Sequence, residues 1–336
     1  MRILVIGGTQ FVGRHLVEVA LARGHELTLF HRGQSGASLF PGVERIRGDR
    51  ETNLDRLAGR RWDAVVDCCG YRPHQLAAST SALKEAVGAY LFISTISVYR
   101  DFRQPGITEA YPAGTALPGL SEGEEPRPDL PIDGATYGPL KARAEQVVRE
   151  AMPDRHLIVR PGIIIGPQDK YTRFNYWIAR ARAGGRMAVP GRPDEQVQFI
   201  DARDLGAFMV RLLEAGTIGT VQATGPASRL THADMIEAVR HGLPEAAEPV
   251  WIAAEAAVSA GVELPVPMRS WVSLDDDFAH IQKMDIAKAL SLGLTTRPLE
   301  ETVRDIRGWL DARGGDEDIA ALAPVERRLL ELADGG

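Results

Sequence analysis

Short apolar runs alternate with amphipathic stretches through the first half of the chain. Residues 3–6 form an all-apolar run, which is typical of a strand buried on both faces of a parallel sheet. Residues 11–22 instead space their apolar side chains three and four positions apart, which predicts an amphipathic helix. The same alternation predicts strands at 26–30, 43–46, 63–67, 90–93 and 156–159 and helices at 74–87 and 137–150. Strands that alternate with helices indicate an α/β fold with a doubly wound parallel sheet.

The first strand leads directly into a glycine-rich turn that opens the first helix. Backbone N–H groups and the dipole at a helix N-terminus favour an anion, and glycines leave room for the phosphates of a nucleotide. The position of the turn in a βα unit predicts a Rossmann-type dinucleotide site, and the alternative is a tight structural turn without a ligand. The residues expected to bind the dinucleotide here are Gly7, Thr9, Gln10, Phe11, Val12 and Gly13.

The end of the second strand bears on the choice of cofactor. Enzymes that use NAD usually carry an acidic residue there, which binds the adenosine ribose hydroxyls. This chain has His31 and Arg32 instead, and a guanidinium can hold the 2′-phosphate of NADP. The sequence therefore favours NADP, with NAD as the alternative, unless Arg32 is only a solvated surface residue. We also expect Asp49 and Arg50 to contact the cofactor, although Asp49 could instead cap the helix that follows it.

Tyr137 and Lys141, at the start of the helix 137–150, are candidate catalytic residues. A tyrosine of ordinary pKa, about 10, is a poor acid or base at neutral pH. Residues four apart share a helix face, so the Lys141 ammonium can favour the phenolate and lower the pKa of Tyr137. Thr95, at the end of the strand 90–93, could hold a substrate oxygen. With the nucleotide turn, the set predicts redox or proton-transfer chemistry, whereas the alternative for Tyr137 is an ordinary helix-start aromatic.

Two stretches interrupt the alternation. Residues 100–135 are rich in proline, glycine and acidic residues and predict a long loop, which is often a functional feature. A chain of 336 residues is long enough for about two domains. We expect a dinucleotide-binding Rossmann domain at 1–166 with about 198–225, and a smaller C-terminal α/β substrate lobe at about 167–197 and 226–336. Beyond residue 166 the pattern predicts helices at 172–183, 204–213, 299–310 and 325–332 and strands near 187, at 197–200 and at 221–223, and it leaves 245–297 without a clear element.

Five motifs resemble those of a known family: 7–13, 92–99, 137–141, Arg160-Pro161 followed by Gly166-Pro167, and 203–205. With them, roughly residues 1–225 resemble the extended short-chain dehydrogenase/reductase superfamily, in its epimerase/dehydratase branch. The resemblance implies catalytic roles for Thr95, Tyr137 and Lys141. It also implies a two-fold homodimer built from the helices at 74–87 and 137–150. The further cofactor-binding residues that it implies are Cys69, Gly70, Ser94, Pro161 and Ile163.

Three departures from the family pattern narrow the function. Gln10 replaces the middle glycine of the turn, a form that resembles an atypical subgroup which includes chloroplast stem-loop RNA-binding proteins. Ile96 and Ser97 follow Thr95 where sugar-nucleotide dehydratases carry Asp-Glu, so 4,6-dehydration is not expected. Residues 162–165 contain no asparagine to hold a sugar diphosphate, which argues against a UDP- or dTDP-sugar substrate.

The substrate site is less sharply marked in the sequence. An aromatic and polar cluster at 171–177 enters the smaller lobe and could line a pocket, although aromatics at this spacing more often form core. The residues expected to contact substrate are Tyr71, Ser97, Arg173 and Tyr176.

Composition excludes several other classes of protein. A net charge of −6 and a pI near 5.8 argue against a nucleic-acid partner, and no run of about 18 apolar residues predicts a membrane span. The two cysteines are adjacent and the histidines lack ligand spacing, so we expect no disulfide, no metal site and a cytoplasmic location. We predict an NAD(P)-dependent oxidoreductase or epimerase that acts on a hydroxyl or carbonyl of a small polar molecule such as a sugar. The second hypothesis is a non-catalytic nucleotide-sensing or RNA-binding protein on the same scaffold.

Overall fold

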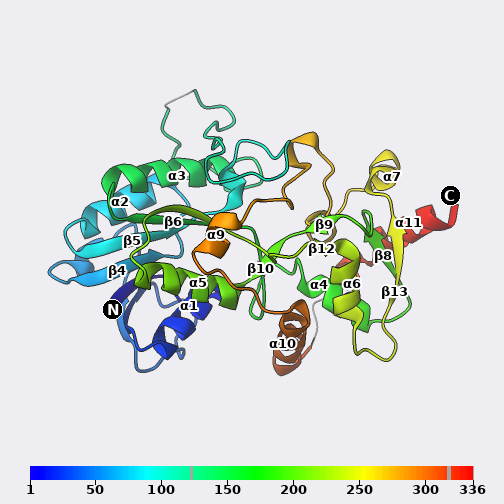
Figure 1. Cartoon of the computed structure of the whole chain (residues 1–336), viewed down its shortest axis with the longest axis horizontal. Helices are drawn as coiled ribbons and strands as arrows, with labels where there is room; N and C mark the ends of the chain where they lie inside the picture. Colours follow the sequence, from blue (N-terminus) through cyan, green and yellow to red (C-terminus); the bar gives the residue numbers. More distant parts are fainter. Residues whose placement is uncertain (122–123, 316–318, 336) are drawn as a thin grey trace.

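A parallel sheet forms the centre of the larger domain in the computed structural model, which describes residues 1–121, 124–315 and 319–335 (Figure 1). In this described part of the chain the sheet has seven strands in the order β11-β6-β5-β4-β1-β2-β3. Its strands are β1 (Arg2–Ile6), β2 (Glu26–His31), β3 (Glu44–Arg47), β4 (Trp62–Asp67), β5 (Val87–Ile93), β6 (His156–Pro161) and β11 (Gly219–Ala223). The order reverses next to β1, which is the topology of a doubly wound Rossmann sheet. The predicted fold class is confirmed.

Helices cover both faces of this sheet (Figure 1). α1 (Phe11–Ala22) and α5 (Ala202–Glu214) pack on one face, and α2 (Pro73–Leu83) and α3 (Tyr137–Ala151) on the other. The pleat explains the division, because successive side chains of a strand point to opposite faces. Ile3 and Val5 of β1 belong to the core under α1 and α5, while Leu4 and Ile6 belong to the core under α2 and α3.

The smaller lobe has its own core around the buried Trp177 and Trp271. Its larger helices and its parallel strand pair are α4 (Asn175–Arg182), α6 (His232–Arg240), α10 (Leu299–Ala312), α11 (Ala323–Gly335), β8 (Arg186–Pro190) and β13 (Glu248–Ile252). Short strand pairs join the two parts: β7 (Ile163–Ile165) with β10 (Phe199–Asp201), and β9 (Gln196–Val197) with β12 (Leu230–Thr231). The short helices are η1 (Leu54–Leu57), η2 (Ile96–Val98), α7 (Ala254–Ser259), α8 (Val266–Arg269), η3 (Asp276–Phe278), α9 (Ala287–Ser291) and η4 (Ala320–Leu322).

Several elements differ from the sequence-based expectation. The helix expected at 74–87 ends at Leu83, because the chain already enters β5 at Val87. The strand expected at 197–200 divides at Gln198, whose buried side chain exchanges hydrogen bonds with Met284. Residues 245–297 hold β13 and several short helices, of which α9 packs on the main sheet. The part around α9 therefore lies with the larger domain, although the whole of 226–336 was expected in the smaller lobe, whereas β13, α7 and α8 contribute to the core of the smaller lobe.

The long segment at 100–135, before α3, is held in place by polar contacts with β11 and with α3. Gln222 of β11 accepts a hydrogen bond from the Tyr99 hydroxyl (2.6 Å) and donates one to the carbonyl of Ile107 (2.7 Å). Arg143 of α3 donates to the carbonyl of Thr115 (2.9 Å). These bonds fix the loop across the carboxyl ends of the strands, where its final residues reach the cleft described below. No helix in the described residues is long and apolar enough to cross a membrane.

Candidate active site

A cleft of about 1220 Å³ lies at the carboxyl ends of β1, β2, β4, β5 and β6, and residues of the smaller lobe close one side of it. This edge of a doubly wound sheet is where the fold class binds its ligands. The site residues predicted from the sequence that line the cleft are Gly7, Thr9, Gln10, Phe11, Val12, Gly13, His31, Arg32, Asp49, Arg50, Cys69, Tyr71, Ser94, Thr95, Ser97, Tyr137, Lys141, Pro161, Ile163 and Arg173. Segments far apart in the chain thus converge on one site.

The glycine turn leaves a cradle at the N-terminus of α1. Gly7 and Gly8 have φ of +102° and +86°, which favours glycine. A Cβ on Gly8 would lie 3.0 Å from the Val5 side chain, and a Cβ on Gly13 would lie 3.0 Å from the backbone of Gly8. The turn is therefore closed behind and open in front, so the first N–H groups of α1 face the cleft. This arrangement fits the pyrophosphate of a dinucleotide.

The end of β2 places His31 and Arg32 at the cleft. The His31 ring accepts a hydrogen bond at Nδ1 from the Gly33 N–H (3.0 Å), so the neutral ring carries its proton on Nε2. Burial and the charges of Arg45 and Arg47 lower the pKa of His31. Arg32 is exposed beside it and has no ion pair among the described residues. The end of β2 thus presents hydrogen-bond donors and cations to a ligand.

The two residues expected after the third strand behave differently from each other. Asp49 lines the cleft and also accepts a hydrogen bond from the Glu51 N–H (2.9 Å), so it caps a turn. Arg50 is buried and makes a bidentate ion pair with Asp67 at 2.7 and 2.8 Å. The guanidinium is therefore neutralised by the end of β4. Arg50 also lines the cleft, so its expected contact with the cofactor stays a prediction, but it offers the cofactor no free charge because that charge is already paired with Asp67.

A close approach of two backbones brings Thr95 and Tyr137 together. A Cβ on Gly138 would lie 2.1 Å from the carbonyl oxygen of Ser97, so only glycine lets α3 begin against η2. The Thr95 hydroxyl accepts a hydrogen bond from the Ser97 N–H (3.1 Å), donates one to the Ser97 hydroxyl (3.2 Å) and lies close to the Tyr137 phenol. Burial raises the pKa of Tyr137, whereas the Thr95 hydroxyl and the charge of Arg173 act to lower it. The net direction is upward.

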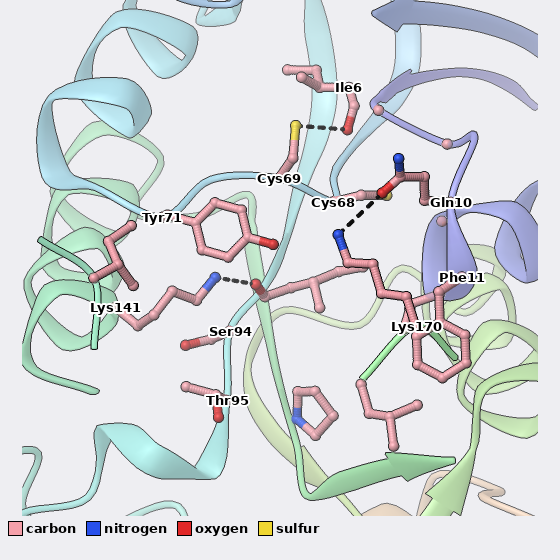
Figure 2. Close-up of a pocket in the computed structure, with 18 of the residues that line it drawn as sticks. Ile6, Gln10, Phe11, Cys68, Cys69, Tyr71, Ser94, Thr95, Lys141 and Lys170 are labelled. Atoms are coloured by element: carbon pink, nitrogen blue, oxygen red, sulfur yellow. Dashed lines mark hydrogen bonds between the residues drawn. The ribbon is translucent and has the colours of Figure 1, made fainter. Parts of the chain in front are cut away.

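Lys141 is buried at the wall of the cleft. Its Nζ donates hydrogen bonds to the carbonyls of Gly70 (2.8 Å) and Ile93 (2.5 Å), and it sits 4.0 Å from the centre of the Phe92 ring. Figure 2 shows this ammonium beside the Tyr71 ring, with one of its hydrogen bonds dashed. Burial lowers the pKa of Lys141 to about 7. The sequence-based expectation that Lys141 lowers the pKa of Tyr137 is not met, because Lys141 is not among the groups that shift that pKa.

Some of the remaining predicted residues line the cleft, and others do not. Tyr71 is 38% exposed and Ser97 and Arg173 also line the cleft, whereas Gly70 contributes its carbonyl to Lys141. Tyr176 is 2% exposed and packs edge-on against Trp177 in the lobe core. The expectation that Tyr176 contacts substrate is therefore wrong.

Several cleft residues were not predicted as site residues from the sequence. The clearest are Lys170, Tyr171 and Asp133. Tyr171 belonged to the aromatic cluster noted at 171–177, and its place before the helix start could have separated it from the buried residues of α4. Asp133 carries a weaker signal, a carboxylate four residues before Tyr137.

Metal and thiol chemistry find no support in the site. No group of three or more His, Cys, Asp or Glu side chains in the described residues is arranged to hold a metal ion. Cys68 and Cys69 are free thiols, and burial raises the pKa of each. Neither thiol is therefore activated as a thiolate.

The phosphate cradle, the topology and the hydroxyl, phenol and amine at one end of the cleft define a Rossmann-type dinucleotide-binding protein. The chain belongs to the NAD dependent epimerase/dehydratase family, which matches residues 3–222. The family predicted from the motifs is confirmed.

Individual relatives are distant. The chain is 27% identical over 268 residues to the 2′-dehydrokanamycin reductase of Streptomyces kanamyceticus, which covers 76% of this chain and 70% of that protein. It is 29% identical over 228 residues to the chloroplast stem-loop binding protein of 41 kDa b of Arabidopsis thaliana, which covers 63% of this chain and 55% of that protein. The solved UDP-glucuronic acid 4-epimerase from Bacillus cereus, in complex with NAD, is 17% identical and has a TM-score of 0.67 over 93% of this chain and 99% of that chain. This last likeness shows the shared fold.

Proposed function

We propose that the protein is an NAD(P)-dependent oxidoreductase or epimerase that acts on a hydroxyl or carbonyl of a small polar, sugar-like molecule. The observation that carries the proposal is the close packing of the start of α3 on η2, which places Thr95 and Tyr137 together on the wall of the cleft that the glycine turn also lines. The similarity to 2′-dehydrokanamycin reductase supports the same class of chemistry. The similarity to the stem-loop binding protein keeps RNA binding as the second candidate function.

The chemistry divides between the cofactor and the chain. A nicotinamide dinucleotide, when bound, accepts or donates the hydride. Tyr137 gives its phenolic proton to the substrate oxygen in reduction, or takes the hydroxyl proton in oxidation. Thr95 holds that oxygen by a hydrogen bond. Because its hydroxyl is already fixed by the Ser97 N–H, it needs little reorganisation to do so.

Lys141 has a positioning role in this proposal. Its ammonium joins the carbonyls of Gly70 and Ile93, which follow or end neighbouring strands β4 and β5. The bond pair fixes the floor of the cleft where the nicotinamide ribose would lie. Tyr137 then receives its tuning from Thr95 and from substrate contacts rather than from Lys141.

The positive charge near the end of β2 supports NADP as the preferred cofactor. The 2′-phosphate carries charge that Arg32 can neutralise, and the Nε2–H of His31 is a further donor. Arg45 and Arg47 already place a positive field on His31, so an anion there is electrostatically favoured.

The test compares Tyr137→Phe with Tyr176→Phe, a buried tyrosine outside the cleft, on a panel of small aldehydes, ketones and sugar derivatives with NADPH and NADP⁺. Tyr137→Phe should keep the fold and the dinucleotide affinity but lose turnover ~10²-fold or more, because it removes only the proton donor. Tyr176→Phe should turn over at the parent rate. Equal rates in the parent and Tyr137→Phe would show that the assigned chemistry is wrong. Absence of any turnover, with a shift of structured RNA in a gel at physiological salt, would favour the RNA-binding function.

A further inference from the structure

A short loop of the smaller lobe forms the wall of the cleft opposite the glycine turn. It runs from Pro167 to α4, and buried polar groups hold it in place. The Asp169 carboxylate accepts a hydrogen bond from the Tyr171 N–H (2.9 Å), and the Asp169 carbonyl accepts one from the Asn175 side chain (3.0 Å). Both Asp169 and Asn175 are fully buried. His15 of α1 donates from Nε2 to the carbonyl of Pro167 (3.1 Å), which ties the loop to the dinucleotide domain.

This loop presents two cations to the cleft, one on each side of an exposed tyrosine. The ammonium of Lys170 and the guanidinium of Arg173 each lie 5.3 Å from the centre of the Tyr171 ring. Lys170 reaches across the cavity to the side-chain oxygen of Gln10 on the glycine turn (3.4 Å), as Figure 2 shows. Arg173 also lines the cleft, and it lies near enough to Tyr137 for its charge to act to lower the pKa of that phenol. Lys170 thus has a partner on the glycine turn, whereas Arg173 does not.

The charge of Arg173 has no carboxylate to balance it among the described residues. Asp133 also lines the cleft, but its Oδ1 accepts hydrogen bonds from the N–H groups of Ala135 and Thr136 at the start of α3. Asp169 is occupied within the loop. A half-buried guanidinium without an ion pair beside a reacting group is well suited to an incoming anion, since Arg binds carboxylate and phosphate in a bidentate way.

We infer that the substrate carries an anionic oxyacid group, a carboxylate or a phosphate, which Arg173 binds while Thr95 and Tyr137 hold the reacting oxygen. The inference rests on the proposed function for the position of the reacting oxygen. Arg173 is then the residue that selects the substrate, and Lys170, beside the phosphate cradle, contacts the dinucleotide instead. A neutral analogue of the same size should be a poor substrate, because it leaves the guanidinium unpaired in the closed cleft.

The experiment uses substrate pairs that differ in one group: a 2-oxo acid against its amide, and a phosphorylated aldehyde against its dephosphorylated form. The parent, Arg173→Gln, Arg173→Lys and Lys170→Gln are compared by kcat/KM with NADPH. The parent should prefer one anionic member about 10- to 100-fold, the scale of one charge-assisted contact. Arg173→Gln should abolish that preference through KM, and Arg173→Lys should restore part of it. Lys170→Gln should keep the preference and weaken dinucleotide binding.

The outcomes separate this inference from the proposed function. Equal kcat/KM for charged and neutral members, or an equal loss on both in Arg173→Gln, would overturn the anionic substrate. A preference within the 2-oxo acid pair would identify the group as a carboxylate, and a preference within the aldehyde pair would identify it as a phosphate. Calorimetry with oxalate and with inorganic phosphate, in the presence of NADP⁺, gives a readout that does not need turnover. Binding that Arg173→Gln loses and Tyr137→Phe keeps would support the anion site even if no substrate of any kind is reduced, whereas no binding of either probe would count against it.

Discussion

The buried amine of Lys141 makes the stability of this protein depend on pH in a way that can be tested without a substrate. Burial lowers the pKa of Lys141 to about 7, while two carbonyls and the Phe92 ring favour its charged form. In the unfolded chain the same amine has a pKa of about 10.4. Between these two values the unfolded chain binds a proton that the folded protein does not. The free energy of unfolding should therefore rise with pH from about 7 towards 10.

The size of the effect follows from the difference between the two pKa values. Each pH unit inside the window adds up to about 1.4 kcal/mol, and integration from about pH 6.5 to 9 gives roughly 2.5 kcal/mol. Other groups titrate in the same range. The pKa values of the buried thiols Cys68 and Cys69 are raised, which lowers stability as pH rises through the ordinary range of a thiol. A comparison with Lys141→Met cancels these contributions, because both proteins contain the same thiols. Methionine also keeps an unbranched side chain, so it can fill much of the same space without a titratable group.

The assay is urea unfolding of the parent and Lys141→Met at a series of pH values from about 6.5 to 9, followed by fluorescence. From the lowest to the highest pH, the free energy of unfolding of the parent should rise by roughly 2 to 3 kcal/mol relative to that of Lys141→Met. A difference in unfolding free energy that stays constant with pH would refute the reasoning. It would mean that the carbonyls of Gly70 and Ile93 keep the ammonium charged in spite of its burial.

Two further predictions concern the cofactor and the start of α3. Arg32→Ala should weaken NADPH binding by roughly 1–3 kcal/mol and leave NADH affinity nearly unchanged, because only the contact with the 2′-phosphate is lost. Calorimetry that finds equal affinity of the parent for both cofactors would contradict it. Gly138→Ala should cost about 1–3 kcal/mol of stability and, where turnover is measurable, ~10²-fold in rate, because a Cβ 2.1 Å from the Ser97 carbonyl must push Tyr137 away from Thr95. Gly308→Ala in α10, where a Cβ meets nothing within 4 Å, is the control and should unfold at or above the parent temperature.

The sequence alone determined the scaffold and the position of the glycine turn at the proposed dinucleotide site. The all-apolar run at β1 and the helical spacing of α1 are patterns among residues close together in the chain, so they can be recognised in the sequence without the structure. The glycine turn is largely local, because the positive φ values belong to Gly7 and Gly8 themselves and a Cβ on Gly8 would meet the side chain of Val5 in the strand before it. For this reason the nucleotide cradle could be predicted from its motif. The approach of Thr95 to Tyr137 joins distant parts of the chain, and the sequence indicated it only through the family resemblance.

Only the tertiary structure decided what each charged or aromatic side chain does. Arg50 and Arg32 both looked available to a cofactor, but Asp67 from another strand neutralises the first. Tyr171 and Tyr176 share one aromatic cluster, and the packing of α4 buries the second while the first stays 52% exposed in the cleft. The side-chain environment of Lys141 likewise depends on carbonyls of two strands. Charge pairing and burial arise from contacts between segments distant in sequence, and they change the pKa and the accessibility of a residue without changing its motif.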